Sequence, residues 1–292
     1  MLVTEWDVLV LDLDGTLLCG QGEVSINNLD ALDMVRESGT EIVIATGRSF
    51  SECAHILRWI QHQGASITAG GSQLVDNVGE TIARETVDVA VTNEVTSLVV
   101  EHGLRCLVLK DTSACDAQYV LVGDAPLHDA STWWFETLGT SLLEVSSLDE
   151  DPWPEHTLRV GAVADKEQLL PLAAELATSL EGKAKLQHWS AVTSSHATGS
   201  STHLLEVFGK TVNKWNMLRH HLGDSMNPTR IVAIGDGLND IEVFQQAGLS
   251  IVMDNADEDV QQYADVIAGR HDEDGFAKAM QRWILPTCSD QQ

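Results

Sequence analysis

Short apolar runs alternate with amphipathic segments over the first 75 residues of the chain. We interpret three of the apolar runs as buried strands, at Val8–Leu13, Glu41–Ala45 and Ala65–Ala69. Between the first two runs, Ser25 can cap a helix whose apolar residues recur at helical spacing, and Gly39 follows its end. A second helix carries Ile56, Leu57 and Ile60. Strands that alternate with helices of this length predict an α/β fold with a doubly wound, Rossmann-like parallel sheet.

The pattern changes in the middle of the chain and then resumes. Between about Arg84 and Leu205, helix-like stretches are mixed with several strand-like ones, which is typical of an inserted α+β domain. From Val212 onward, helices and strands alternate again. We therefore expect a core formed by residues 1–83 and 206–292, interrupted by a second domain at 84–205.

The charge of the chain excludes several classes of function. Its 17 Lys and Arg against 44 Asp and Glu give a formal net charge of −27, which repels nucleic acids and anionic membranes. The five cysteines are scattered and form no C-x-x-C pair, which favours reduced thiols and a cytoplasmic location. The apolar run near the N-terminus is short and interrupted by Asp12 and Asp14, so we expect neither a signal peptide nor a membrane span.

Acidic residues follow two of the expected buried strands. Asp12 and Asp14 come at the end of the first strand, where residues two apart share one face. Asp236 follows the apolar run Ile231–Ile234, and Asp240 comes four residues later. Ligands of open α/β sheets bind at such strand ends, and carboxylate oxygens are the ligands that Mg²⁺ prefers. Solvated turn residues are the alternative interpretation of Asp12 and Asp14.

Two further segments indicate binding of an anion. Thr46-Gly47-Arg48-Ser49 joins an expected strand to a helix, and its hydroxyl, amides and guanidinium together suit a phosphate. The alternative is that this segment only caps the helix. Lys214 lies in the first turn of an expected helix, where the core resumes. It either clamps phosphate or is an ordinary surface lysine.

Taken in order, these motifs resemble those of the haloacid dehalogenase-like superfamily. They are DLDGT at Asp12–Thr16, Thr46-Gly47-Arg48, the helical Lys214, and GDGLND at Gly235–Asp240. The interval between the first two motifs leaves no room for a cap domain, whereas the interval between Thr46 and Lys214 does. The chain therefore resembles a Cof-type phosphatase with an α/β cap, and the similarity extends to Ser66–Leu74, Met253–Ala256 and Glu273–Phe276.

The resemblance implies a role for each matching residue. Asp12 would be the nucleophile that forms an aspartyl phosphate, and Asp14 would be the general acid and then the general base. Phosphate would be bound by Thr46, Gly47, Lys214 and Asn239. Mg²⁺ would be bound by Asp12, the backbone carbonyl of Asp14, Asp236 and Asp240, the last directly or through water. These roles predict a Mg²⁺-dependent phosphatase of small phosphorylated metabolites, acting as a monomer or a homodimer.

Other interpretations stay open. A phosphomutase of related architecture and a non-catalytic phospho-acceptor or metabolite-binding protein would both use such a site. A dehalogenase is disfavoured because Asp14 would have no leaving alcohol to protonate.

Three positions depart from the family pattern, namely Gly70 in place of asparagine, and Trp215 and Asp254 in place of glycines. Trp215 is either a buried helix residue or borders the substrate. At most one of Trp133 and Trp134 faces the site, where stacking on a sugar is the less favoured interpretation. The polar stretch Thr193–His203 is either a substrate-facing hairpin turn or a solvated loop.

Overall fold

The computed structural model describes residues 6–20, 22–190, 202–224 and 226–285. The stretch Thr193–Ser201 therefore lies outside the described residues. Residues 83–212 form one compact unit, which we call the inserted unit, and the residues on both sides of it form the core unit. Among the described residues, none of the helices has the length and apolar character that crossing a membrane requires.

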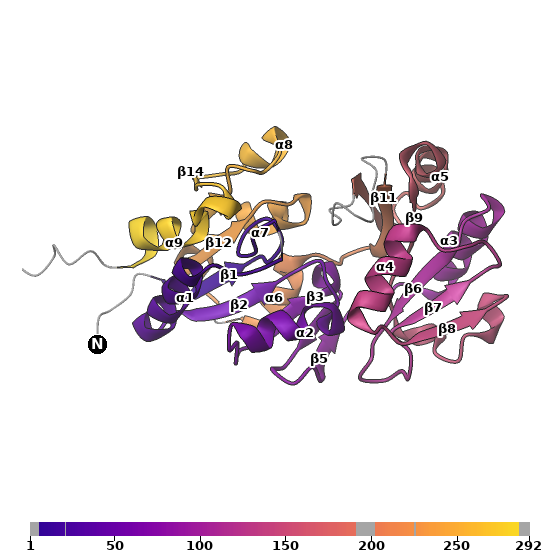
Figure 1. The fold of residues 1–292 in the computed structure, drawn as a ribbon, viewed down its shortest axis with the longest axis horizontal. Coiled ribbons are helices and arrows are strands. Elements are labelled where there is room, and N and C mark those ends of the chain that lie inside the picture. The colour runs from indigo at the N-terminus through magenta and orange to yellow at the C-terminus, as the bar shows by residue number, and fades with distance from the viewer. Residues whose placement is uncertain (1–5, 21, 191–201, 225, 286–292) are drawn as a thin grey trace, which may run out of the picture. The chain divides into compact units, whose positions relative to one another are not determined.

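An eight-stranded sheet forms the centre of the core unit (Figure 1). Its strands, in spatial order, are β14 (Val266–Ile267), β13 (Leu249–Val252), β12 (Ile231–Gly235), β1 (Val8–Leu11), β2 (Glu41–Ala45), β3 (Ser66–Thr68), β4 (Gln73–Val75) and β5 (Thr81–Arg84). The strands from β14 to β3 run parallel, and β4 returns antiparallel to β3. The predicted doubly wound parallel sheet is therefore confirmed.

The core unit also contains helices. They are α1 (Ile26–Ser38), α2 (Phe50–Trp59), α6 (Lys214–Leu222), α7 (Ile241–Phe244), α8 (Glu258–Gln261) and α9 (Gly275–Ala279), the last continued by a π-helical turn at Met280–Ile284. Leu9 and Leu11 of β1 share one hydrophobic core with residues of α1, α2 and α9, including Leu32 and Phe276. Burial of each such side chain contributes about 1.5–3 kcal/mol, so the core fixes the sheet on which the strand ends lie.

The order of the strands reverses between β1 and β12. The chain passes from β1 to β2 and β3 on one side of this point, and from β12 to β13 and β14 on the other. β1 and β12 pair in parallel, with Leu11 opposite Ile234, so their carboxyl ends lie next to each other. Such a reversal is where open α/β sheets bind ligands. Asp12 and Asp236 follow these two strand ends directly.

The inserted unit contains a six-stranded sheet with helices on both faces. The strands, in spatial order, are β10 (Ala184–Ser190), β11 (Thr202–Gly209), β9 (Thr157–Asp165), β6 (Cys106–Lys110), β7 (Tyr119–Val122) and β8 (Leu142–Val145), antiparallel except for the pair β7 and β8. Helices α3 (Val89–Glu101) and α5 (Lys166–Ser179) share a hydrophobic core with Val120 of β7. The adjacent Tyr119 packs its ring 5.1 Å from Phe135 of α4 (Asp129–Leu138). Because successive strand residues point to opposite faces, α4 covers the other face.

Two boundaries near the expected site differ from those that the sequence predicts. β1 ends at Leu11 and not at Leu13, because three amides of the following loop converge on the carbonyl oxygen of Leu13 and turn the chain. The sequence predicts that Asp12 and Asp14 share one face of this strand. That prediction is wrong, because both residues lie beyond the end of β1. Helix α6 begins at Lys214 and not at Val212, because the Asn213 side chain caps it by accepting a hydrogen bond from the amide of Asn216.

Candidate active site

Asp12 is a buried carboxylate at the reversal of the sheet. Its side chain is 7% exposed, and its amide donates to the carbonyl of Ile234 at 3.1 Å, which ties the residue to the neighbouring strand β12. Its Oδ1 accepts a hydrogen bond from Lys214 Nζ at 2.7 Å. The aspartate is therefore fixed both by its backbone and by a charged partner that lies 202 positions away in the sequence.

Lys214 is the first residue of α6, and its side chain is fully buried. Nζ donates to Asp12 Oδ1 at 2.7 Å and to Asp240 Oδ1 at 2.6 Å. The start of α6 lies so close to Gly71 that a Cβ on that glycine would overlap the backbone of Asn213. Gly71 also has a φ of 105°, which disfavours other residues. This glycine, which no sequence reasoning singled out, brings the helix and its lysine close to the core.

Asp236 and Asp240 complete a cluster of acids. One carboxylate oxygen from each of Asp12, Asp236 and Asp240 lies within 4.8 Å of the others. Asp240 Oδ2 also accepts a hydrogen bond from the amide of Gly237 at 3.0 Å, which fixes its side chain in the turn after β12. A Cβ at Gly15, whose φ is 71°, would overlap the Asp236 carboxylate. Only a glycine at this position lets the loop after β1 approach Asp236 so closely.

The electrostatics of the cluster show an excess of negative charge. Burial, and then the charge of Asp240, raises the pKa of Asp236 to about 7. Burial also raises the pKa of Asp12 well above its usual range, and the charges of Asp240 and Asp236 add to this effect while Lys214 opposes it. Burial disfavours the charged form of Lys214, but the two aspartates overcome this penalty and raise its pKa. One ammonium thus faces three carboxylates. Hard oxygen donors with surplus negative charge fit a divalent cation such as Mg²⁺.

Asp14 lies outside this carboxylate cluster and pairs with Arg48. Its side chain is 50% exposed, and the guanidinium binds it with two hydrogen bonds, from Nε to Oδ2 at 2.7 Å and from Nη2 to Oδ1 at 2.6 Å. This bidentate geometry defines the direction of the carboxylate. The sequence motif assigned Arg48 to an anion site, and in the structure its partner is an acidic side chain of the protein itself.

The remaining predicted residues lie at neighbouring strand ends. Thr46 follows β2 and is fully buried, and its hydroxyl accepts a hydrogen bond from the amide of Arg48 at 3.2 Å. A Cβ at Gly47 would lie 3.4 Å from Asn239 Nδ2, so the loop after β2 and the turn after β12 are in contact. Trp215 is buried in α6. The structure therefore gathers the predicted residues around the ends of β1, β2 and β12.

Comparisons with known proteins identify chains that are similar to this one. The model of the haloacid dehalogenase-like hydrolase family matches residues 9–280. The chain is 27% identical to the chloroplastic endoribonuclease YBEY of Arabidopsis thaliana, an alignment that covers 96% of the chain and only 47% of that protein. It is 25% identical to the 5-amino-6-(5-phospho-D-ribitylamino)uracil phosphatase YcsE of Bacillus subtilis. That alignment covers 95% of this chain and 96% of YcsE. The crystal structure of a haloacid dehalogenase-like hydrolase from Bacteroides thetaiotaomicron shares the fold, with a TM-score of 0.76 and 24% sequence identity. The superposition covers 95% of this chain and 99% of that one.

Proposed function

The chain belongs to the haloacid dehalogenase-like hydrolase family, and on that basis we propose that it is a Mg²⁺-dependent, Cof-type phosphatase of small phosphorylated metabolites. The observation that carries this proposal is the buried Asp12 carboxylate, hydrogen-bonded to Lys214 and grouped with Asp236 and Asp240. The phosphatase YcsE of Bacillus subtilis, which aligns over nearly its whole length, acts on a small phosphorylated metabolite according to its name.

In the first half of the reaction, Asp12 is the nucleophile. Lys214 binds its Oδ1, which leaves Oδ2 to attack the phosphorus of the ester. The bond between phosphorus and the ester oxygen breaks. Asp14, protonated and released from its ion pair with Arg48, gives its proton to the departing alkoxide. Lys214 lowers the electrostatic cost of bringing a phosphate dianion to a carboxylate. The products of this step are the free alcohol and an aspartyl phosphate at Asp12.

In the second half, water releases the phosphate. Asp14, now deprotonated, takes a proton from the water molecule as its oxygen attacks phosphorus. The bond between phosphorus and the Asp12 oxygen breaks, which restores the carboxylate and frees inorganic phosphate. Such acid and base catalysis contributes about 10²- to 10⁴-fold to the rate. Thr46, Gly47 and Asn239 would hold the phosphoryl oxygens during both steps.

The donors of the cluster suit Mg²⁺. Asp12, Asp236 and the backbone carbonyl of Asp14 would hold the ion, with Asp240 beside it or linked through water. When bound, Mg²⁺ supplies positive charge that neutralises the repulsion between the phosphate and the surrounding carboxylates.

The inserted unit holds none of the residues to which we assign chemistry, because these all lie in residues 12–48 and 214–240. We infer that it selects the substrate by covering the phosphate site when a small ester binds. Lids of this kind exclude water and strengthen the electrostatic contacts beneath them.

We do not extend the proposal to ribonuclease activity. The alignment with the chloroplastic endoribonuclease covers less than half of that protein, at 47%. The net charge of −27 also opposes the approach of an RNA backbone.

A phosphate-release assay tests the proposed function. The protein should hydrolyse p-nitrophenyl phosphate with Mg²⁺ and lose this activity in EDTA, and a panel of phosphorylated metabolites should then identify the preferred class. Undiminished turnover after complete chelation would refute the metal requirement. Stable phosphorylation of Asp12 without release of phosphate would indicate a phospho-acceptor, and transfer of the phosphoryl group to a second sugar hydroxyl would indicate a phosphomutase.

A further inference from the structure

Asn255 lies beyond the carboxyl end of β13 and contacts two parts of the site at once. Its Nδ2 donates to the backbone carbonyl of Gly15 at 2.9 Å and to Asp236 Oδ2 at 3.0 Å. Its Oδ1 accepts a hydrogen bond from the amide of His271 at 3.0 Å. One half-buried side chain therefore joins the loop that carries Asp12, the carboxylate of Asp236, and the chain that leads to α9.

Only an amide side chain fulfils these three contacts. Gly15 and Asp236 each require a donor, and the amide of His271 requires an acceptor. Asn carries two N–H donors and a carbonyl acceptor on one short stem, whereas an ionised Asp has no donor and Lys or Arg has no acceptor. An amide also adds no charge beside a carboxylate whose pKa burial has already raised.

The contacts define the orientation of the Asp236 carboxylate. Asn255 binds its Oδ2 at 3.0 Å, and the hydroxyl of Thr16 lies 3.4 Å from its Oδ1. Two donors, one on each oxygen, fix the plane of the carboxylate. Gly15 lies next to Asp14, whose backbone carbonyl is an expected Mg²⁺ ligand, so the bond to the Gly15 carbonyl also fixes the adjoining peptide.

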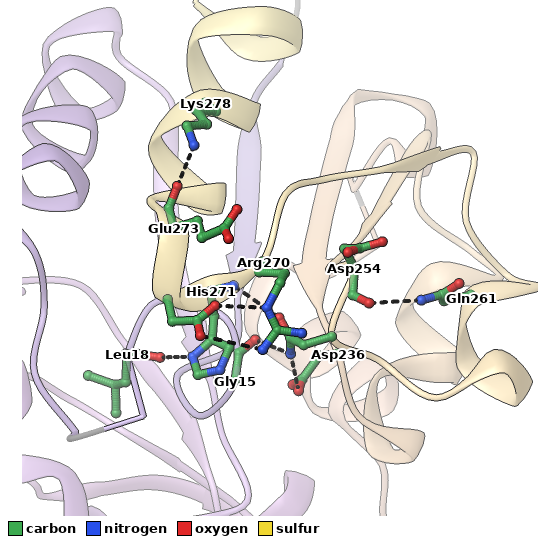
Figure 2. Close-up of polar contacts among 11 residues, drawn as sticks. Gly15, Leu18, Asp236, Asp254, Gln261, Arg270, His271, Glu273 and Lys278 are labelled. Carbon is green, nitrogen blue, oxygen red and sulfur yellow. Dashed lines mark hydrogen bonds and ion pairs between the residues drawn. The ribbon is translucent and has the colours of Figure 1, made fainter.

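Asn255 is itself held in place by its surroundings. The side chain of Gln261 donates to the carbonyls of Asp254 at 3.1 Å and Ala256 at 3.0 Å, the residues on both sides of Asn255. His271 Nδ1 lies 2.7 Å from the carbonyl of Leu18, which connects the same loop to the same C-terminal segment (Figure 2). These hydrogen bonds fix the backbone on both sides of Asn255 and therefore the position of its side chain.

We propose that Asn255 is a positioning residue that aligns Asp236 and the loop after β1 for binding of the divalent cation. The inference rests on the proposed function, since it concerns the same metal site. In this role Asn255 acts through its hydrogen bonds to the Gly15 carbonyl and Asp236, and not as a ligand of the metal. Residues that orient metal ligands in this way typically contribute about 10- to 100-fold to metal affinity or activity.

Asn255→Ala tests this role by direct binding of a metal. Mn²⁺ serves as the probe, because free Mn²⁺ is measured by electron paramagnetic resonance, and Mg²⁺ competes for the same oxygen ligands. We expect Asn255→Ala to bind Mn²⁺ and Mg²⁺ about 10- to 100-fold more weakly than the unchanged protein. Turnover of p-nitrophenyl phosphate should recover as Mg²⁺ is raised, because the ligands are still present.

Asn28 offers a matched control. It is buried, donates from Nδ2 to the carbonyl of Leu17 at 3.1 Å and accepts from the amide of Ala277 at 3.1 Å. It therefore joins the same loop to the same C-terminal segment without touching Asp236. Asn28→Ala should lower the melting temperature but leave Mn²⁺ affinity unchanged.

The outcomes separate this inference from the proposed function. If Asn255→Ala melts lower but binds Mn²⁺ as tightly as the unchanged protein, Asn255 is only structural and the inference is refuted. If the unchanged protein itself binds no Mn²⁺ or Mg²⁺, the metal site fails, and with it both proposals. Should Asn255→Ala not fold, Asn255→Gln is the second variant. It keeps the amide but moves it one methylene away from the backbone, so it cannot align with Gly15, Asp236 and His271 at once. It should show the same weakened binding, and unchanged affinity there would also refute the role.

Discussion

Replacing Lys214 with methionine removes a cation that the structure places between two buried carboxylates. Lys214 Nζ lies 2.7 Å from Asp12 Oδ1 and 2.6 Å from Asp240 Oδ1, and all three side chains are buried. Methionine has a similar length but no charge. Removing one partner of a buried ion pair typically costs about 3–5 kcal/mol, because the other charge stays buried without compensation. We expect Lys214→Met to lose this much unfolding free energy at pH 7.5 in EDTA.

The loss should depend on pH in a defined direction. Without Lys214, the pKa of the Asp12 carboxyl, already raised by burial, rises further in the folded state. A carboxyl group with a higher pKa in the folded state than in the unfolded state stabilises the folded protein at pH values below the unfolded pKa. This stabilisation is lost as the pH rises through the folded pKa. Protonation is easier at lower pH by about 1.4 kcal/mol per pH unit. At pH 5.5 the difference between the variant and the unchanged protein should therefore be smaller than at pH 7.5.

Urea unfolding followed by circular dichroism, in EDTA at both pH values, measures these differences. Lys110→Met is the matched control, because Lys110 is also fully buried and binds a single carboxylate, that of Asp151, together with Thr157 in the inserted unit. Both variants should be less stable than the unchanged protein, but Mg²⁺ should restore stability only to Lys214→Met, where the cation replaces the lost charge. A loss below about 1 kcal/mol for Lys214→Met at pH 7.5, or the same loss at both pH values, would refute the electrostatic account of the cluster.

Further predictions concern catalysis, the metal site and the inserted unit. Asp12→Asn should abolish phosphate release, whereas Asp14→Asn should slow it by about 10²- to 10⁴-fold, and less in the first step for esters with good leaving groups; near-normal rates for Asp12→Asn would reject the nucleophile. Gly15→Ala should weaken Mn²⁺ binding and cost at least about 1–2 kcal/mol of unfolding free energy, because φ is 71° and the new methyl group overlaps Asp236; unchanged binding would contradict this. Since the pKa of Asp236 is about 7 without metal, protons should compete with Mn²⁺ and weaken its binding at pH 6 relative to pH 8, and equal affinities would count against a role of Asp236 in the site. Activity should be confined to small esters, and efficient hydrolysis of a folded phosphoprotein would reject the lid model of the inserted unit.

Much of the fold was predictable from local patterns. The apolar runs predict the central strands β1, β2 and β12, and the change of pattern in the middle of the chain predicts an inserted α+β block. Asp12 and Asp236 were recognised as strand-end acids because the parallel strands of a doubly wound sheet all end at one edge. These features depend on spacing along the chain, and spacing is what a sequence shows directly.

The partners of each functional side chain were decided only by the tertiary structure. Lys214 reaches Asp12 across 202 positions because α6 starts against Gly71, and this close approach has no local sequence signal. Asp14 pairs with Arg48, because β1 ends early and the following loop turns the side chain away from the buried cluster. Asn255, known from the sequence only as part of a matching stretch, meets Asp236 at the end of an adjacent strand.

The sequence by itself therefore determined which residues carry charge and at which strand ends they lie. The tertiary structure decided which of these charges are buried together and which are exposed. The physical reason is that hydrogen bonds and ion pairs act over only a few ångströms, so they depend on strand register, loop turns and close backbone approaches between segments far apart in the chain.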